Sequence, residues 1–76
     1  MCRFSIGTQV VNFADLLSGH YDVWVIQQVQ SGKRCNYYYT IFRADGTSGF
    51  KSIADYREKD YVDFNYIRKY NPELLV

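Results

Sequence analysis

The chain has 76 residues, with nine lysines and arginines against eight aspartates and glutamates, and a formal net charge of +1. This length predicts one domain, residues 1–76, with a small core. The near-neutral charge argues against the strongly basic surface typical of nucleic-acid binders. No apolar run approaches the roughly 20 residues of a membrane span, and no basic-then-apolar leader follows Met1, so we expect a cytoplasmic protein without a membrane partner.

The N-terminal residues predict a strand. Cys2, Phe4 and Ile6 alternate with polar side chains, which is the period-two pattern of a half-buried strand, and Gly7 would end it. Cys2 and Cys35 are the two cysteines of the chain. Two thiols without a secretory signal usually stay reduced, so we expect no disulfide between them.

A short helix is predicted over residues 13–18. Asn12 has Asp15 three residues later, a spacing typical of a helix N-terminal cap. Gly19 suits the C-terminal cap, because glycine readily adopts the left-handed conformation that ends many helices.

Residues 21–30 and 34–43 predict a long antiparallel hairpin. Both runs are rich in β-branched and aromatic side chains, and Ser31-Gly32 between them fits a two-residue turn. Counting through that turn pairs Trp24 with Tyr39 and Ile26 with Tyr37.

The Asp45-Gly46 pair predicts a second tight turn, which leads into a third strand over residues 47–52. Counting through this turn places Phe50 opposite Ile41 and Lys51 opposite Thr40. Phe50 is then expected on the same face as Trp24, and Lys51 on the other face.

The two faces of this predicted meander differ in composition. One is a continuous apolar layer, which we assign to the core: Trp24, Ile26, Tyr37, Tyr39, Ile41 and Phe50. The other mixes an apolar strip with polar side chains: Tyr21, Val23, Val25, Tyr38 and Phe42 beside Gln27, Asn36, Thr40 and Lys51. A chain this short has little material to cover both faces, so the strip is expected to contact a partner.

Residues 52–70 fit a C-terminal helix or a fourth strand. Ser52 with Asp55 resembles a helix start, and apolar residues recur at helical spacing from Tyr61, with a break near Lys59 and Asp60. Alternation from Val62 to Tyr66 fits a strand instead. The helix is preferred, and the residue before Pro72 ends either element.

These elements predict an α+β fold. We expect a small single domain with an antiparallel sheet of three to four strands, a short N-terminal helix and a C-terminal helix, with the helices packed on one face of the sheet.

No motif predicts catalysis, a cofactor or a metal site. His20 is the only histidine, and neither Cys2 nor Cys35 lies in a strand-to-helix turn of the kind that presents a nucleophile. The three residues also lack the paired spacing usual in zinc sites. Gly32-Lys33 opens a strand rather than a helix, unlike a phosphate loop. We therefore expect no enzyme activity and a dispensable His20.

The tyrosines of the second hairpin strand leave nucleic-acid binding as the alternative function. Aromatic residues interleaved with cations form stacking platforms for single-stranded nucleic acid, and Lys33, Arg34 and Arg43 surround three tyrosines here. In the predicted register only Tyr38 faces outward, because Tyr37 and Tyr39 turn into the core. The result is a weak platform.

The function favoured by the sequence is that of a small non-enzymatic protein that docks on another protein. A compact inhibitor fits this description, such as those that phages and mobile elements direct against host restriction, CRISPR or transcription systems; this placement is an analogy from size and the absence of a site. A homodimer is the simplest competing use of the strip. The residues predicted to contact the partner are Tyr21, Val23, Val25, Lys33, Arg34, Tyr38, Phe42 and Lys51.

Overall fold

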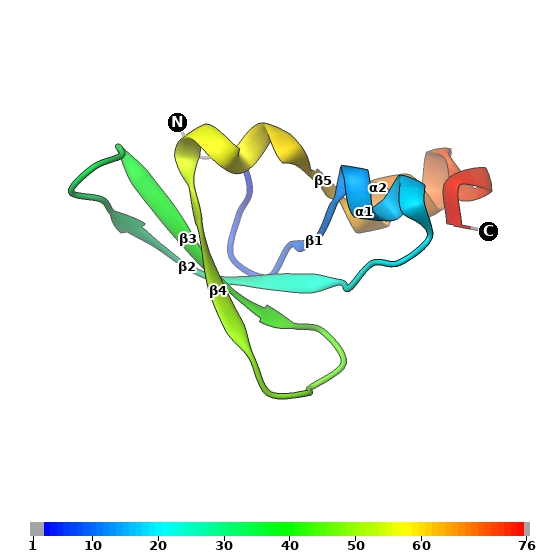
Figure 1. Cartoon of the computed structure of the whole chain (residues 1–76), viewed down its shortest axis with the longest axis horizontal. Helices are drawn as coiled ribbons and strands as arrows, with labels where there is room; N and C mark the ends of the chain where they lie inside the picture. The colour runs from blue at the N-terminus through cyan, green and yellow to red at the C-terminus, as the bar shows by residue number, and fades with distance from the viewer. Residues whose placement is uncertain (1–2, 76) are drawn as a thin grey trace.

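The computed structural model describes residues 3–75 (Figure 1). Three consecutive strands occupy the middle of the described chain, and short helices lie before and after them. In chain order the elements are β1 (Gln9–Asn12), α1 (Phe13–Ser18), β2 (Trp24–Ser31), β3 (Tyr37–Arg43), β4 (Phe50–Ala54), the 3-10 helix η1 (Asp55–Asp60), β5 (Tyr61–Asp63), α2 (Phe64–Tyr70) and the 3-10 helix η2 (Pro72–Leu75).

The strands form one antiparallel sheet in the order β4-β3-β2-β1-β5. This confirms the predicted α+β class and the meander of β2, β3 and β4. The sheet has five strands among the described residues, where three or four were expected, because β1 and β5 extend the meander. β4 and β5 are the edges of the sheet. The sheet curls so that these edges approach each other: Ile53 of β4 and Tyr61 of β5 belong to one buried cluster. Within residues 3–75 no helix has both the length and the apolar character needed to cross a bilayer.

The predicted N-terminal strand over residues 2–6 is wrong. Residues 3–7 form bends and turns, Cys2 lies outside the described residues, and β1 begins only at Gln9. Phe4 is buried because its backbone N–H donates to the Tyr39 hydroxyl (3.1 Å) and its ring packs on the Tyr39 ring. Ile6, which the alternation placed inward, is 69% exposed. Gly7 turns the chain with φ 92°, a conformation that favours glycine.

Helix α1 matches its predicted bounds and caps. The Asn12 side chain accepts a hydrogen bond from the Asp15 backbone N–H (3.0 Å), and Gly19 ends the helix in the left-handed conformation with φ 84°. Both signals are local to the helix ends, so the sequence was sufficient to identify them.

The hairpin of β2 and β3 has a different register from the predicted one. The connection spans residues 32–36 instead of Ser31-Gly32, and the observed pairs are Trp24 with Arg43 and Ile26 with Ile41. The partner of Ile26 on β3 is therefore four residues further along the chain than the predicted partner, Tyr37. Because alternate residues share a face, an even displacement leaves the core face unchanged. Trp24, Ile26, Tyr39 and Ile41 are buried as predicted, and Tyr37 is half-buried.

The register of β3 and β4 is displaced by one residue, and this exchanges the faces of β4. Phe50 pairs with Phe42 and Lys51 with Ile41, so Ile53 enters the core and Phe50 is 68% exposed. The cause is a six-residue connection, residues 44–49, in place of a tight Asp45-Gly46 turn. The Asp45 carboxylate accepts hydrogen bonds from the Thr47 backbone (2.9 Å) and hydroxyl (2.7 Å), which stabilises the wider loop.

The C-terminal region combines the two predicted alternatives. Ser52 lies within β4 and caps no helix; η1 ends at Asp60, where a break was expected, and β5 follows as a three-residue strand. Helix α2 starts at Phe64, because the Asp63 side chain accepts hydrogen bonds from the Asn65 and Tyr66 backbones. It ends before Asn71-Pro72 as predicted.

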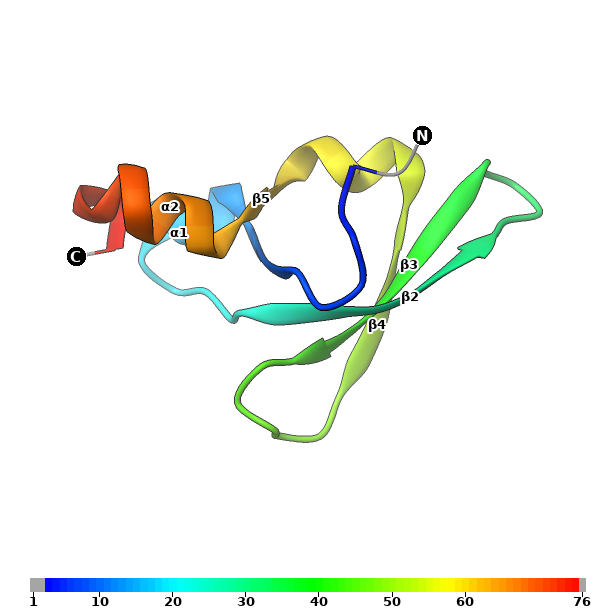
Figure 2. The same cartoon turned by 180° about the vertical axis from the view of Figure 1, so that it is seen from behind.

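Two buried clusters lie on opposite faces of the sheet. The helices α1 and α2 pack on one face, as predicted, and this face is the one opposite Trp24. Val10, Trp24, Ile26, Tyr39, Ile41, Ile53 and Tyr61 form the larger cluster with Phe4. Val11 points the other way from Val10 and forms the smaller cluster with Leu16 of α1 and Ile67 of α2. Figure 2 shows α1, α2 and η2 gathered beside β5, while η1 runs from the end of β4 to β5. On β2, β3 and β4, the face opposite the larger cluster lies away from the two α-helices; it carries Val25, Phe42 and Phe50.

The cap of α2 gives a direct stability prediction. Asp63→Ala removes the side-chain acceptor for two backbone N–H groups, Asn65 (2.9 Å) and Tyr66 (3.2 Å). We expect a loss of about 1 kcal/mol in the free energy of unfolding, measured by urea denaturation. Asp63→Asn, which keeps an acceptor oxygen, should lose less. Equal losses for both variants would contradict the capping role.

Candidate partner-binding surfaces

The uncovered face of the meander carries an aromatic row. Val25 of β2, Phe42 of β3 and Phe50 of β4 lie side by side through the strand pairing. The ring centroids of Phe42 and Phe50 are 5.7 Å apart; Phe42 is 37% exposed and Phe50 is 68% exposed. We call this surface the open face; it comprises Val25, Gln28, Gln30, Tyr38, Thr40, Phe42, Phe50, Ser52 and Ala54.

The structure retains only part of the predicted partner-binding strip on the open face. Val25, Tyr38 and Phe42 lie there. Tyr21 instead packs against Phe64 of α2, with ring centroids 6.0 Å apart, and belongs to the smaller cluster. Val23 precedes β2 and is half-buried; its carbonyl accepts a hydrogen bond from the Ala44 backbone (2.8 Å).

The three predicted cations are divided between two places. Lys33 and Arg34 are exposed in the β2–β3 connection, at the tip of the hairpin. Lys51 lies on the opposite side of the sheet from the open face, so its predicted place beside Val25 is wrong. The one-residue register displacement exchanges it with Phe50, which the sequence placed in the core. The faces of Phe50 and Lys51 could not be assigned correctly from the sequence, because the length of the β3–β4 loop was not known.

A second surface lies along the seam between the two edge strands. The Lys51 ammonium is 4.6 Å from the centroid of the Trp24 ring and 5.7 Å from that of Tyr61. A hollow of about 160 Å³ adjoins β4 there, lined by Lys51, Ser52, Ile53, Arg57 and Tyr61. A wider hollow of about 350 Å³ continues past Lys51 and Trp24 to Asp15, His20, Tyr21 and Asp22. We call the two together the edge groove.

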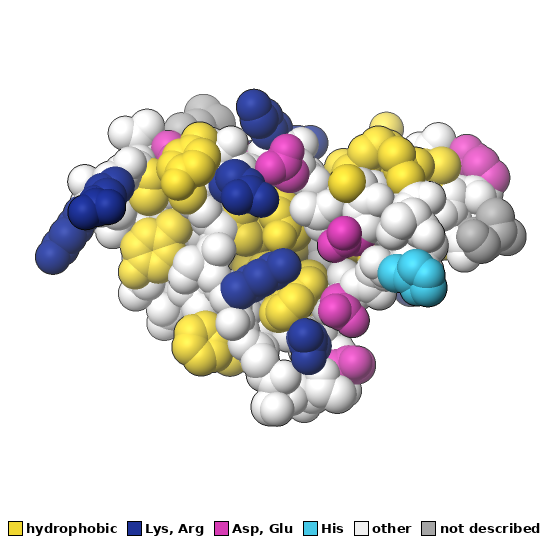
Figure 3. Space-filling view, viewed as in Figure 1, with side chains coloured by type: hydrophobic (Ala, Val, Ile, Leu, Met, Phe, Trp, Pro, Cys, Tyr) yellow, Lys and Arg dark blue, Asp and Glu magenta, His cyan; other side chains and the backbone are white. Residues whose placement is uncertain are grey.

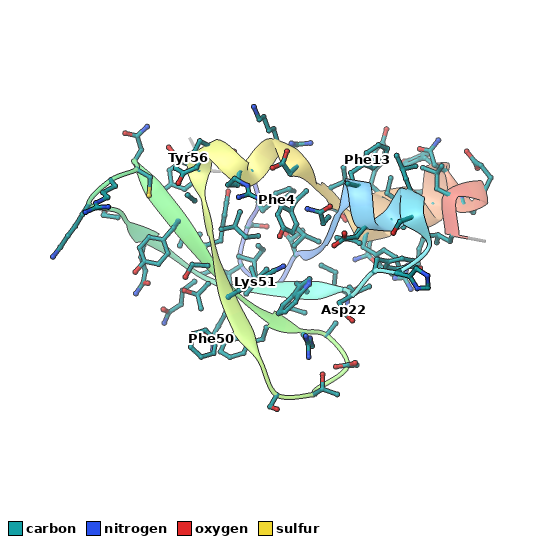
Figure 4. All side chains as sticks on the ribbon, in the orientation of Figure 1. Phe4, Phe13, Asp22, Phe50, Lys51 and Tyr56 are labelled. Atoms are coloured by element: carbon teal, nitrogen blue, oxygen red, sulfur yellow. The ribbon has the colours of Figure 1, made fainter. Side chains whose placement is uncertain are left out.

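The edge groove separates opposite charges. Figure 3 shows dark blue side chains along the β4 side and magenta side chains facing them on the side of the α-helices, with yellow side chains between. Arg43 stacks on the Trp24 ring at 5.2 Å, and its Nε lies 3.8 Å from the Asp22 carboxylate. Figure 4 shows the neighbours Phe50 and Lys51 pointing to opposite sides of β4.

A hydrogen-bonded carboxylate fixes η1 against the sheet. Glu58 accepts hydrogen bonds from the Tyr37 hydroxyl (2.9 and 3.0 Å), the Tyr39 hydroxyl and the Arg3 backbone N–H (3.0 Å). Burial alone would raise the pKa of Glu58, but these hydrogen bonds outweigh it and hold the pKa below its usual value. Burial and the bond to Glu58 raise the pKa of both tyrosines. The neutral phenols therefore act as donors, and the cluster is structural.

Of the residues weighed for catalysis and metal binding, Cys2 lies outside the described residues, and His20 and Cys35 lie at opposite ends of β2. His20 is exposed before β2, whereas Cys35 is a half-buried free thiol in the connection at the far end of that strand. Among residues 3–75 no group of three or more histidine, cysteine, aspartate or glutamate side chains is arranged to hold a metal ion. We take the open face and the edge groove as the candidates for function, because they carry the predicted partner-binding residues Val25, Tyr38, Phe42 and Lys51.

Comparison with known proteins adds no relative. The chain matches no family model, no curated protein and no solved structure. Function therefore has to be argued from the chemistry of these two surfaces.

Proposed function

We propose that this chain is a non-enzymatic binding protein that docks on another protein through the open face. The observation that carries the proposal is the Phe42–Phe50 pair, two aromatic rings exposed side by side on sheet strands that the α-helices leave uncovered. Burying such rings against a partner is favourable, and contiguous exposed apolar surface usually marks an interaction site. Bound in this way, the protein would block its partner's surface. Inhibition of a host defence or transcription system by such blocking requires no catalytic group.

The composition of the open face favours a protein partner over nucleic acid. Lys51 and Arg43, which the stacking-platform alternative required near the tyrosines, contact the Trp24 ring on the other side of the sheet. Tyr39 is buried and Tyr37 is half-buried, which leaves Tyr38 as the tyrosine of β3 on this face. A face of aromatic, valine, glutamine and hydroxyl side chains without cations suits a protein interface better than a phosphate backbone.

Site-specific photo-crosslinking tests the proposal. p-Benzoylphenylalanine in place of Phe50 should crosslink one protein partner in cells of the source organism, with mass spectrometry to identify it. The same group in place of Tyr70, which is 57% exposed on α2, is the matched control. Crosslinking of the same protein from both positions, or of nucleic acid from position 50, would contradict docking through the open face.

The identified partner then allows a quantitative prediction. Phe50→Ala should weaken binding at least about tenfold by isothermal titration calorimetry, as expected for a central interface aromatic. Its melting temperature should stay near that of the wild type, because the Phe50 side chain lies mostly in solvent. Tyr70→Ala should leave the affinity unchanged.

A further inference from the structure

The outer edge of β4 provides backbone groups for a further strand. β4 pairs with β3 on one side and is the last strand of the sheet on the other. An edge strand of this kind presents unpaired N–H and C=O groups to which an extended segment can add. The hollow beside β4 gives such a segment direct access to this edge.

The side chains along this edge define what the added strand should carry. Alternate residues of an added strand point to opposite faces, as those of β4 do. One set would lie beside Phe50 on the open face, and the other beside Lys51 over the Trp24 and Tyr61 rings. Neighbours on adjacent strands interact, so the residues beside Phe50 should be apolar and the residue beside Lys51 should be acidic.

Lys51 is the cation that best receives a partner's carboxylate. It is exposed, and among residues 3–75 no carboxylate lies within ion-pair distance of its ammonium. Arg57, the second cation of this hollow, already donates to Asp60 (3.2 Å). The acids of the edge groove, Asp15 and Asp22, line its other part, beyond Trp24. The stretch beside β4 is therefore positive.

We infer that β4 binds an extended protein segment with alternating acidic and apolar residues, which adds to the sheet as a further strand with a carboxylate at Lys51. The inference concerns the edge of β4 and stands whether or not the open face docks a protein. Main-chain hydrogen bonds supply affinity in this mode of recognition, and the side chains supply selectivity.

A blocked hexapeptide of alternating glutamate and valine is the probe. Titrated into the ¹⁵N-labelled full chain, it should shift the amide signals of residues 50–54 and the Trp24 indole signal. The same peptide with alternate backbone nitrogens methylated should not bind, because methylation removes its main-chain donors. A lysine and valine hexapeptide should bind more weakly than the glutamate one.

Variants of the protein locate the carboxylate. Lys51→Met keeps the length of the apolar stem and should weaken binding of the glutamate peptide by about threefold to fivefold, the upper part of the range of an exposed charge pair. Lys33→Met, at the hairpin tip, is the matched control and should have no effect. The amide spectrum of each variant checks that it is folded.

Four outcomes would overturn the inference: equal binding of the methylated peptide, equal binding of the lysine peptide, an unchanged affinity in Lys51→Met, or no shift at millimolar peptide. Displacement of the peptide by a short single-stranded oligothymidylate that binds more tightly would also overturn it. That result would assign the edge groove to nucleic acid.

Discussion

Replacing Trp24 with alanine should cost about 3–5 kcal/mol of the free energy of unfolding, because it empties the centre of the larger cluster. Trp24 is 7% exposed, and Arg43 and Lys51 stack on its ring. A domain of this size has only a few kcal/mol of net stability, so the variant is expected to be largely unfolded at 25 °C. Circular dichroism during urea denaturation measures the loss.

Phe50→Ala is the matched comparison for Trp24→Ala. The sequence placed both aromatics in one core layer, whereas the structure leaves Phe50 68% exposed. Phe50→Ala should therefore change stability by no more than about 0.5 kcal/mol. If both variants lost several kcal/mol, the register between β3 and β4 would be wrong and the open face would be part of the core.

The second large effect is expected at Glu58. Glu58→Gln removes the charge that accepts hydrogen bonds from Tyr37, Tyr39 and the Arg3 backbone. Charge-assisted hydrogen bonds are stronger than neutral ones, so we expect a loss of about 1–2 kcal/mol at pH 7. Glu73→Gln, at an exposed position of η2, is the control and should have little effect.

The pH dependence of the Glu58 effect has a definite sign. The pKa of Glu58 is lower in the folded chain than its ordinary value of 4.5, so the folded state holds the carboxylate more strongly than the unfolded state does. This contribution is fully present above pH 4.5 and is lost as the pH falls through the lower folded pKa. The stability difference between wild type and Glu58→Gln should therefore shrink on acidification. A difference that stays constant from pH 7 to pH 3 would show that the charge of Glu58 has no part in the effect.

Local signals in the sequence predicted the structure better than counted registers did. Asn12 and Gly19 define α1 because each cap depends on a few neighbouring residues. The faces of β2 and β3 were also predictable, since alternation along one strand fixes which residues are buried together. The pairing of β1 with β5 joins residues about 50 positions apart, and no local pattern indicates it.

On the candidate surfaces, too, residues placed by local alternation were predicted correctly, and residues placed by counting through a loop were not. Val25, Tyr38 and Phe42 were found because they alternate with core residues on their own strands. Phe50 and Lys51 were exchanged because the assignment depended on the number of residues in one loop. The Asp45–Thr47 hydrogen bonds that widen this loop could have been suspected from the Asp-Gly-Thr sequence, but its length of six residues could not.

The position of β1 between β2 and the edge strand β5 has a consequence for the order of folding. β2, β3 and β4 are consecutive, so this meander can assemble as soon as it has been synthesised. β1 is made first, yet one of its two neighbours, β5, ends only at Asp63. Closing a loop of about 50 residues costs entropy that is repaid only when the distant strands meet. During synthesis β1 can therefore pair with β2 early, but it acquires its second neighbour, and Val11 its packing against Ile67, only after β5 and α2 have been made.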